Sequence, residues 1–192
     1  MTELLLKFFI YSVLGWGCEC LWHFVWNGHF REKRMLLNLP MCPVYGLGGV
    51  CLSYLLTGFY DNILSLYLLG VLLASAVELL YYLICAQAFG IMIWDYSKMP
   101  ANFAGGICIG YSLLWGFLAV AVVRMLDPAA DFLLGKLAEN TKLTAAVFLS
   151  VLTAADMRKT AEILRNYGRG ETEKLPQCFW YIEKISEKFT KE

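Results

Sequence analysis

Long stretches without charge alternate with short polar connections along this chain, and the pattern predicts helices that cross a bilayer. Apolar residues dominate at about 4–26, 43–60, 63–91 and 103–124. A helix rises about 1.5 Å per residue, so about 20 residues cross the roughly 30 Å hydrocarbon core. We therefore expect a transmembrane helix in each stretch. The second helix should begin at Pro43, because proline suits a first helical turn.

A fifth span is predicted at about 140–157, although its uncharged part, Leu143–Ala155, is only 13 residues long. Lys142 would then lie at an interface with its amine reaching toward water. A four-span arrangement with the N-terminus inside divides the basic residues near the membrane evenly, four to four. Five spans with the N-terminus outside place four outside and these eight inside: Arg31, Lys33, Arg34, Lys98, Arg158, Lys159, Arg165 and Arg169. Cytoplasmic loops are rich in lysine and arginine, so we expect five spans, N-out and C-in.

Residues 158–192 are polar and charged, unlike the predicted transmembrane domain at 1–157, and they are expected to form a cytosolic tail. Apolar residues recur at helical spacing within it and predict an amphipathic helix: Phe179, Ile182, Ile185 and Phe189. Three positions are open to this helix, namely the membrane surface, a cytosolic partner, or the loops of its own chain. The expected fold class is all-α, a polytopic helical membrane protein with a short amphipathic tail.

Composition supports a membrane environment. Of the 192 residues, 59% are hydrophobic and 17% are charged, and the mean hydropathy is +0.56. A soluble domain carries about 25% charged residues. The formal net charge is zero, so we expect no nucleic-acid partner. The seven cysteines form no C-x-x-C pair and the sequence contains no G-x-x-x-x-G-K-[ST], so we expect no metal, no other cofactor and no bound nucleotide.

Ionisable residues inside the predicted spans are the first candidates for a function, because a charge in hydrocarbon is costly. Glu19 and His23 lie one helical turn apart in the first span, close enough to hydrogen-bond. Glu78 lies near the middle of the third span, on a face with Ser75 and Tyr82. For each glutamate, a structural bond to a neighbouring helix and a role along a path or proton relay are open alternatives.

Small residues in the spans predict close packing of helices. Gly106 and Gly110 form a G-x-x-x-G pair at the fourth span, and Gly116 continues the row of small residues. Gly46 has a similar place in the second span. Such rows let helix backbones approach closely in lipid.

Two polar residues stand at the connection between the third and fourth spans. Asp95 follows Trp94 at the end of the third, and Asn102 precedes the fourth. We expect Asp95 to cap a turn and Asn102 to cap the next helix, because short polar side chains accept bonds from free backbone N–H groups. Ligand binding is the alternative for both.

Five short stretches in a fixed order carry a resemblance to a known family. They are Tyr11-Ser-Val-Leu-Gly-Trp16 with Glu19, Asn38-Leu-Pro-Met-Cys-Pro-Val-Tyr-Gly46, Trp94-Asp-Tyr96-Ser97, Asn102 with Gly105-Gly-Ile-Cys108, and Ser112-Leu-Leu-Trp-Gly116. Over about residues 8–125 the chain resembles the ABC-transporter permease family of the CmpB type, which are small bacterial membrane proteins. The resemblance places the residues expected of the family at Glu19, Pro40, Cys42, Pro43, Tyr45, Gly46, Glu78, Asp95, Asn102, Gly105 and Trp115.

The chain departs from the family pattern at positions where charge is expected. Gly106 and Met92 stand where the family has basic residues, and Ala86 stands where it has a glutamate. The run Lys33-Arg34-Met35 replaces Asn-Arg-Gly. These losses weaken any mechanism that uses the missing charges, and they favour a non-transport role.

The resemblance implies a permease-like subunit in the cell membrane, working with a separate ATPase and with other membrane chains or further copies of itself. The alternative is a membrane scaffold or regulatory subunit that binds partners through its spans and the Phe179–Phe189 helix. We do not expect an enzyme built on Glu19, His23 and Asp95, because no nucleophile stands beside a base.

Overall fold

Proline and glycine set several helix ends in the computed structural model, which describes residues 1–189, with side chains as far as Ser186. The helices are α1 (Thr2–Asn27), α2 (Pro43–Leu56), α3 (Ile63–Phe89), α4 (Ile109–Ala121), α5 (Asp127–Gly135), α6 (Glu139–Gly168) and α7 (Trp180–Phe189). Proline is the first residue of α2. Gly28 and Gly90 end α1 and α3 with φ angles of 71° and 68°, which glycine adopts without strain.

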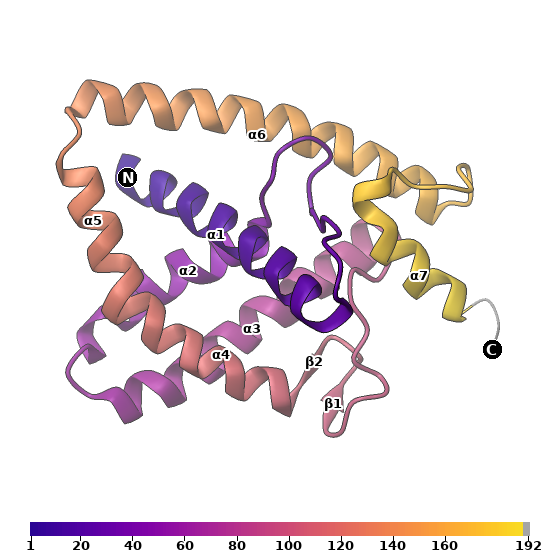
Figure 1. Ribbon diagram of the computed structural model, residues 1–192, viewed down its shortest axis with the longest axis horizontal. Coiled ribbons are helices and arrows are strands. Elements are labelled where there is room, and N and C mark those ends of the chain that lie inside the picture. The colour runs from indigo at the N-terminus through magenta and orange to yellow at the C-terminus, as the bar shows by residue number, and fades with distance from the viewer. Residues whose placement is uncertain (190–192) are drawn as a thin grey trace.

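The long helices run lengthwise through the molecule, so the chain passes back and forth between its two ends (Figure 1). The N-terminus, the α2–α3 turn and the α5–α6 turn lie toward one end, on the left of the figure. The segment between α3 and α4 and helix α7 lie toward the other. We call these the N-terminal end and the tail end.

Among residues 1–189, three helical stretches are long and apolar enough to cross a membrane: α1, α3 and Ile109–Gly135. In the last stretch a π-helical turn, Val122–Leu126, joins α4 to α5 without a break. Helix α2 and the 3-10 turn after it form a shorter apolar helix, Pro43–Phe59. Helix α6 contains the span predicted at 140–157 and continues to Gly168, but it is too polar to qualify by composition. The number of spans therefore stays a prediction.

The fourth predicted span, 103–124, begins too early. Residues 102–108 form a small hairpin in which β1 (Asn102–Phe103) pairs antiparallel with β2 (Ile107–Cys108), and helix starts only at Ile109. The turn between the strands contains Ala104 and Gly105, both with positive φ. Because these residues are small and uncharged, the turn cannot be recognised from hydropathy.

Large apolar side chains cover much of the outer surface. Those exposed on α1, α3, the Ile109–Gly135 stretch and α6 include Leu14, Leu21, Val25, Leu64, Leu68, Leu72, Leu80, Phe117, Met125, Leu143, Val147, Phe148 and Val151. A soluble monomer rarely exposes large continuous apolar surface, because water disfavours it. Lipid tails suit the same surface, and the molecule is accordingly an all-α membrane protein.

Small residues bring pairs of helices together. A Cβ at Gly46 would collide with Ser12 and Phe8 of α1, and a Cβ at Gly116 would collide with Tyr67 and Val71 of α3. Gly110 is different, because in the described part of the chain no atom lies within 4 Å of the place its Cβ would take. Gly46 and Gly116 therefore lie at close helix contacts, and Gly110 does not.

Buried lysines at the N-terminal end connect α1 to the later helices. Lys7 Nζ lies 2.7 Å from Asp127 Oδ1 and 2.7 Å from Asp131 Oδ1, and the Tyr11 hydroxyl donates to Asp127 Oδ1 at 2.8 Å. Lys142 is paired in the same way, with Glu3 at 2.6 Å.

The Lys142 side chain is itself only 5% exposed, but its amine pairs with Glu3 and Glu139, whose side chains are 51% and 83% exposed. Its place at an interface therefore stays a prediction.

The amphipathic segment of the tail packs on its own chain. Phe179 and Ile182 are 0% and 1% exposed and lie in a core with Cys85, Ile91 and Leu164. In the structure this helix therefore packs against loops and helices of its own chain, which is the third of the three alternatives. The side chain of Phe189 lies outside the described residues.

Replacing Lys7 with methionine should lower the free energy of unfolding by about 3–5 kcal/mol, because Asp127 keeps its burial and loses its cation. The double variant Lys7→Met with Asp127→Leu should regain much of that loss. Denaturant or thermal unfolding in detergent measures both. Exposed Lys159→Met is the matched control and should unfold as wild type does. A single Lys7→Met variant as stable as wild type would contradict the structural role of the pair.

Candidate functional site

Two glutamates of different helices lie in one network of polar and aromatic side chains inside the bundle. The network, here called the Glu19–Glu78 cluster, consists of Glu19 (α1), Lys33 (the α1–α2 loop), Tyr45 (α2), Glu78 (α3), Tyr96 (the α3–α4 segment), and Tyr111 and Trp115 (α4). Four helices and two connecting segments thus contribute to it. It contains both glutamates that the sequence singles out.

Glu19 is paired with two residues from outside its own helix. Lys33 Nζ donates to Glu19 Oε2 at 2.8 Å, and the Tyr45 hydroxyl donates to Oε1 at 2.8 Å. His23 lies elsewhere, with its ring 5.1 Å from the Trp180 ring, and its Nδ1 is buried with no hydrogen-bond partner among the described residues. The structure therefore brings Glu19 to α2 and the α1–α2 loop and does not join it to His23.

Glu78 is almost completely buried, with 7% of the residue exposed. Trp115 Nε1 donates to its Oε2 at 2.8 Å, and the Tyr96 hydroxyl donates to its Oε1 at 3.1 Å. Burial and the Glu78 carboxylate raise the pKa of Tyr96 above its ordinary value, so this hydroxyl keeps its proton and remains a donor. Each oxygen of Glu78 thus has one donor.

Aromatic rings join the two halves of the cluster. Tyr45 meets Trp115 edge to face with ring centroids 6.0 Å apart, so residues bonded to Glu19 and to Glu78 contact each other. Tyr111 stacks on Trp115 and on Tyr96, at 6.2 and 4.9 Å. Tyr45 and Trp115 thus connect the partners of the two glutamates by a direct ring contact.

Asp156 of α6 fixes the loop that carries the proline motif. It accepts hydrogen bonds from Leu39 N at 2.8 Å and from the backbone and side-chain nitrogens of Asn38 at 2.9 and 2.8 Å. Cys42 N donates to Ser12 O of α1, which holds the other end of the loop. The chain then enters α2 directly after Cys42, and Tyr45 lies on its first turn.

Within this loop Pro40 and Pro43 restrict the backbone on either side of Met41 and Cys42. Cys42 is fully buried, and burial together with the Glu19 carboxylate raises the pKa of its thiol to about 12. The thiol therefore stays protonated at neutral pH. Cys42 therefore acts as a packed side chain at the start of α2.

The segment between α3 and α4 is folded so that it presents Tyr96 to Glu78. Trp94 Nε1 donates to Gly106 O at 2.8 Å, and Tyr96 N donates to Gly105 O at 2.9 Å. Asp95 Oδ1 accepts from Ser97 N at 2.9 Å and so caps a turn. These bonds hold the backbone on both sides of the tyrosine.

Asn102 does not cap α4, because residues 102–108 form the hairpin and α4 begins later, at Ile109. Its amide instead donates to Ser97 O and Met99 O, and its oxygen lies 3.3 Å from Gly105 N. A Cβ at Gly106 would lie 2.7 Å from the Tyr82 ring, so a larger residue here requires the ring to move.

The sequence singled out several residues that the structure does not place in the cluster. Trp16 lies on α1 with its Nε1 buried and without a partner in the described part of the chain. Asp95 and Asn102 support the turn and touch neither glutamate in the bonds given above. Among residues 1–186 no three His, Cys, Asp or Glu side chains are grouped to hold a metal ion.

Sequence analysis missed Lys33, Tyr111 and Asp156 as functional candidates. Lys33 and Asp156 lie just outside apolar runs, where charged residues are ordinary. Tyr111 lies one turn before Trp115 on α4, a spacing that is visible in the sequence but equally common in a packed core.

Comparisons with known proteins place the cluster within a family. A family model described as "Putative ABC-transporter type IV" matches residues 6–161, which include every residue of the Glu19–Glu78 cluster. No curated protein and no solved structure matches the chain.

Replacing Glu78 with alanine should lower the free energy of unfolding by about 1–3 kcal/mol, because two partly buried donors lose their acceptor. Glu78→Gln should lose less, since an amide oxygen still accepts from Trp115. Thermal unfolding of the purified chain in detergent checks both variants. Exposed Glu162→Ala on α6 serves as the control and should change little. Equal stability of Glu78→Ala and this control would show that the two donors do not depend on Glu78.

Proposed function

The chain belongs to the family described as "Putative ABC-transporter type IV", and from this membership we propose that it is the multi-pass membrane subunit of an ABC-type transporter. The family match extends from α1 through most of α6 and supports this assignment. The ATPase would be a separate chain, because this sequence contains no G-x-x-x-x-G-K-[ST] motif. The chain itself would be no enzyme.

We place the subunit in the cell membrane with its tail end in the cytosol. The basic residues at that end support this orientation: Arg31, Lys33, Arg34, Lys98, Arg158, Lys159, Arg165 and Arg169. In this orientation the α1–α2 loop and the α3–α4 segment are the parts that an ATPase can reach. A path for a substrate would be completed by other membrane chains or further copies of this one.

The observation that carries the proposal is that connecting segments supply donors to Glu19 and Glu78. Lys33 lies in the α1–α2 loop and Tyr96 in the α3–α4 segment, whereas both glutamates lie on long apolar helices. A movement of either segment therefore changes the pairing of a carboxylate inside the bundle. An ATPase that binds these segments and moves them would change the hydrogen bonds to Glu19 and Glu78 at each cycle of ATP binding and hydrolysis.

A scaffold or regulatory subunit is the second candidate, and the completeness of the pairing favours it. Every carboxylate oxygen of Glu19 and Glu78 already has a donor, as expected of a network that only holds helices together. The apolar side of the tail helix contributes nothing to this alternative, because Phe179 and Ile182 are buried in the chain itself.

Purification of the tagged full-length chain from its native membrane in mild detergent tests the proposal. A nucleotide-binding protein with a G-x-x-x-x-G-K-[ST] motif should co-purify in near-stoichiometric amount, and the complex should hydrolyse ATP. Mass spectrometry and phosphate release measure the two. Absence of such a protein from repeated preparations would contradict the transporter assignment.

The double variant Glu19→Gln with Glu78→Gln separates the two candidates. In a transporter it should still capture the ATPase, while the rate of ATP hydrolysis changes roughly tenfold, about 1.4 kcal/mol of activation free energy. In a scaffold both capture and hydrolysis should match those of the control Glu162→Gln. The ratio of ATP turnover to captured ATPase is the quantity to compare.

A further inference from the structure

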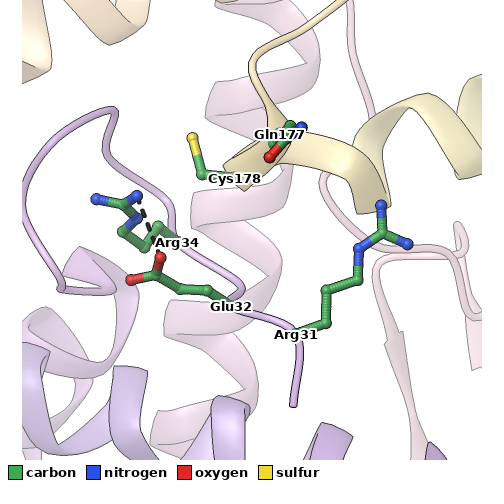
Figure 2. Close-up of a pocket in the computed structure, with 5 residues that line it drawn as sticks. All are labelled: Arg31, Glu32, Arg34, Gln177 and Cys178. Carbon is green, nitrogen blue, oxygen red and sulfur yellow. Dashed lines mark ion pairs between the residues drawn. The ribbon is translucent and has the colours of Figure 1, made fainter. Parts of the chain in front are cut away.

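A pocket of about 380 Å³ opens at the tail end, between the loop after α1 and the segment that leads into α7. Arg31, Glu32 and Arg34 line it from the loop, and Gln177 and Cys178 line it from the other side (Figure 2). Its volume is that of an ordinary small-molecule site. None of these residues takes part in the Glu19–Glu78 cluster, so the pocket is a separate feature of the protein.

The arginines leave N–H groups for an anion. Arg34 donates to Asn38 O at 2.8 Å and pairs with Glu32 at 3.2 Å, while its Nε is buried with no partner in the described residues. Arg31 lies over the Trp180 ring, with its guanidinium carbon 4.2 Å from the centroid. A guanidinium carries five N–H donors, and a contact with an aromatic ring uses none of them as a hydrogen bond to an oxygen.

The charge of the lining suits one negative ligand. The lining contains two arginines and one carboxylate, that of Glu32, which pairs with Arg34, so it carries a net positive charge. Gln177 and Cys178 on the opposite side of the pocket are uncharged.

Exposed aromatic residues place the pocket at the edge of the bilayer. Trp22 and Trp26 on the last turns of α1 are 49% and 68% exposed, and Phe30, directly before Arg31, is 64% exposed. Tryptophan collects at the level of lipid headgroups, where an amphipathic ring is most stable. The arginines follow these rings in the chain and therefore lie at the depth of lipid phosphates.

We propose that this pocket binds the phosphate of an anionic phospholipid headgroup, held by Arg31 and Arg34. The bound lipid joins the α1–α2 loop to the tail and so stabilises the position of Lys33, the neighbour of Arg34 and the partner of Glu19. The site rests on the membrane setting alone and does not require an ATPase.

Native mass spectrometry of the purified full-length chain, titrated with phosphatidylglycerol or phosphatidylcholine, tests the proposal. Phosphatidylglycerol should bind about tenfold more tightly, and Arg31→Gln and Arg34→Gln should each lose roughly tenfold in affinity for it. Exposed Arg158→Gln removes the same charge at the same end and should bind as wild type does. The expected lipid should also raise the unfolding temperature of wild type more than that of Arg31→Gln.

Three results would overturn the proposal. The first is equal affinity for the two lipids, and the second is an Arg31→Gln variant that retains wild-type affinity. Arg31 is the decisive position, because Arg34 also holds Asn38 and its replacement can disturb the loop. The third is displacement of the lipid by millimolar inorganic phosphate or by an acidic peptide, which would assign the pocket to a soluble anion or a protein. Recovery of an ATPase in the separate purification is independent of all three.

Discussion

A charge inside an apolar bundle must be paired, and in this protein the pairs decide which elements become neighbours. Lys7 joins α1 to α5 through Asp127, and Asp156 joins α6 to the loop before α2. Removing one partner leaves an uncompensated charge at a cost of several kcal/mol, so these contacts select one arrangement of otherwise similar oily helices. Dispersion between small-residue rows then completes the packing at Gly46 and Gly116.

The carboxylates of the Glu19–Glu78 cluster, the candidate functional site, are paired in the same way. Its donors come from connecting segments, and its carboxylates come from long helices, so the connections are tied to the interior of the bundle. The proposed lipid-phosphate pocket lies on the same α1–α2 loop, with Arg34 next to Lys33. Lipid at one side of the loop and Glu19 at the other would therefore stabilise a single loop conformation.

The sequence was informative about helices and about which residues are unusual, and much less so about partners. Apolar runs and the proline at the start of α2 predicted that helix correctly, and Glu19 and Glu78 stood out because charge is rare in such runs. Their partners, Lys33 and Tyr96, could not be identified, because periodicity gives the face of one helix and says nothing of what crosses it. The hairpin at 102–108 was hidden by its small uncharged residues.

The central claim is that the helices cross a membrane and leave the Glu19–Glu78 cluster near the cytosolic end. Cysteines introduced at Leu137, before α6, and at Glu173, after it, test this most directly with a membrane-impermeant maleimide on intact cells. The wild-type chain gives the background from its own seven thiols. We predict labelling of Leu137→Cys in intact cells and of Glu173→Cys only after permeabilisation. Labelling of both from the same side would show that α6 does not cross, and it would contradict the orientation on which the account depends.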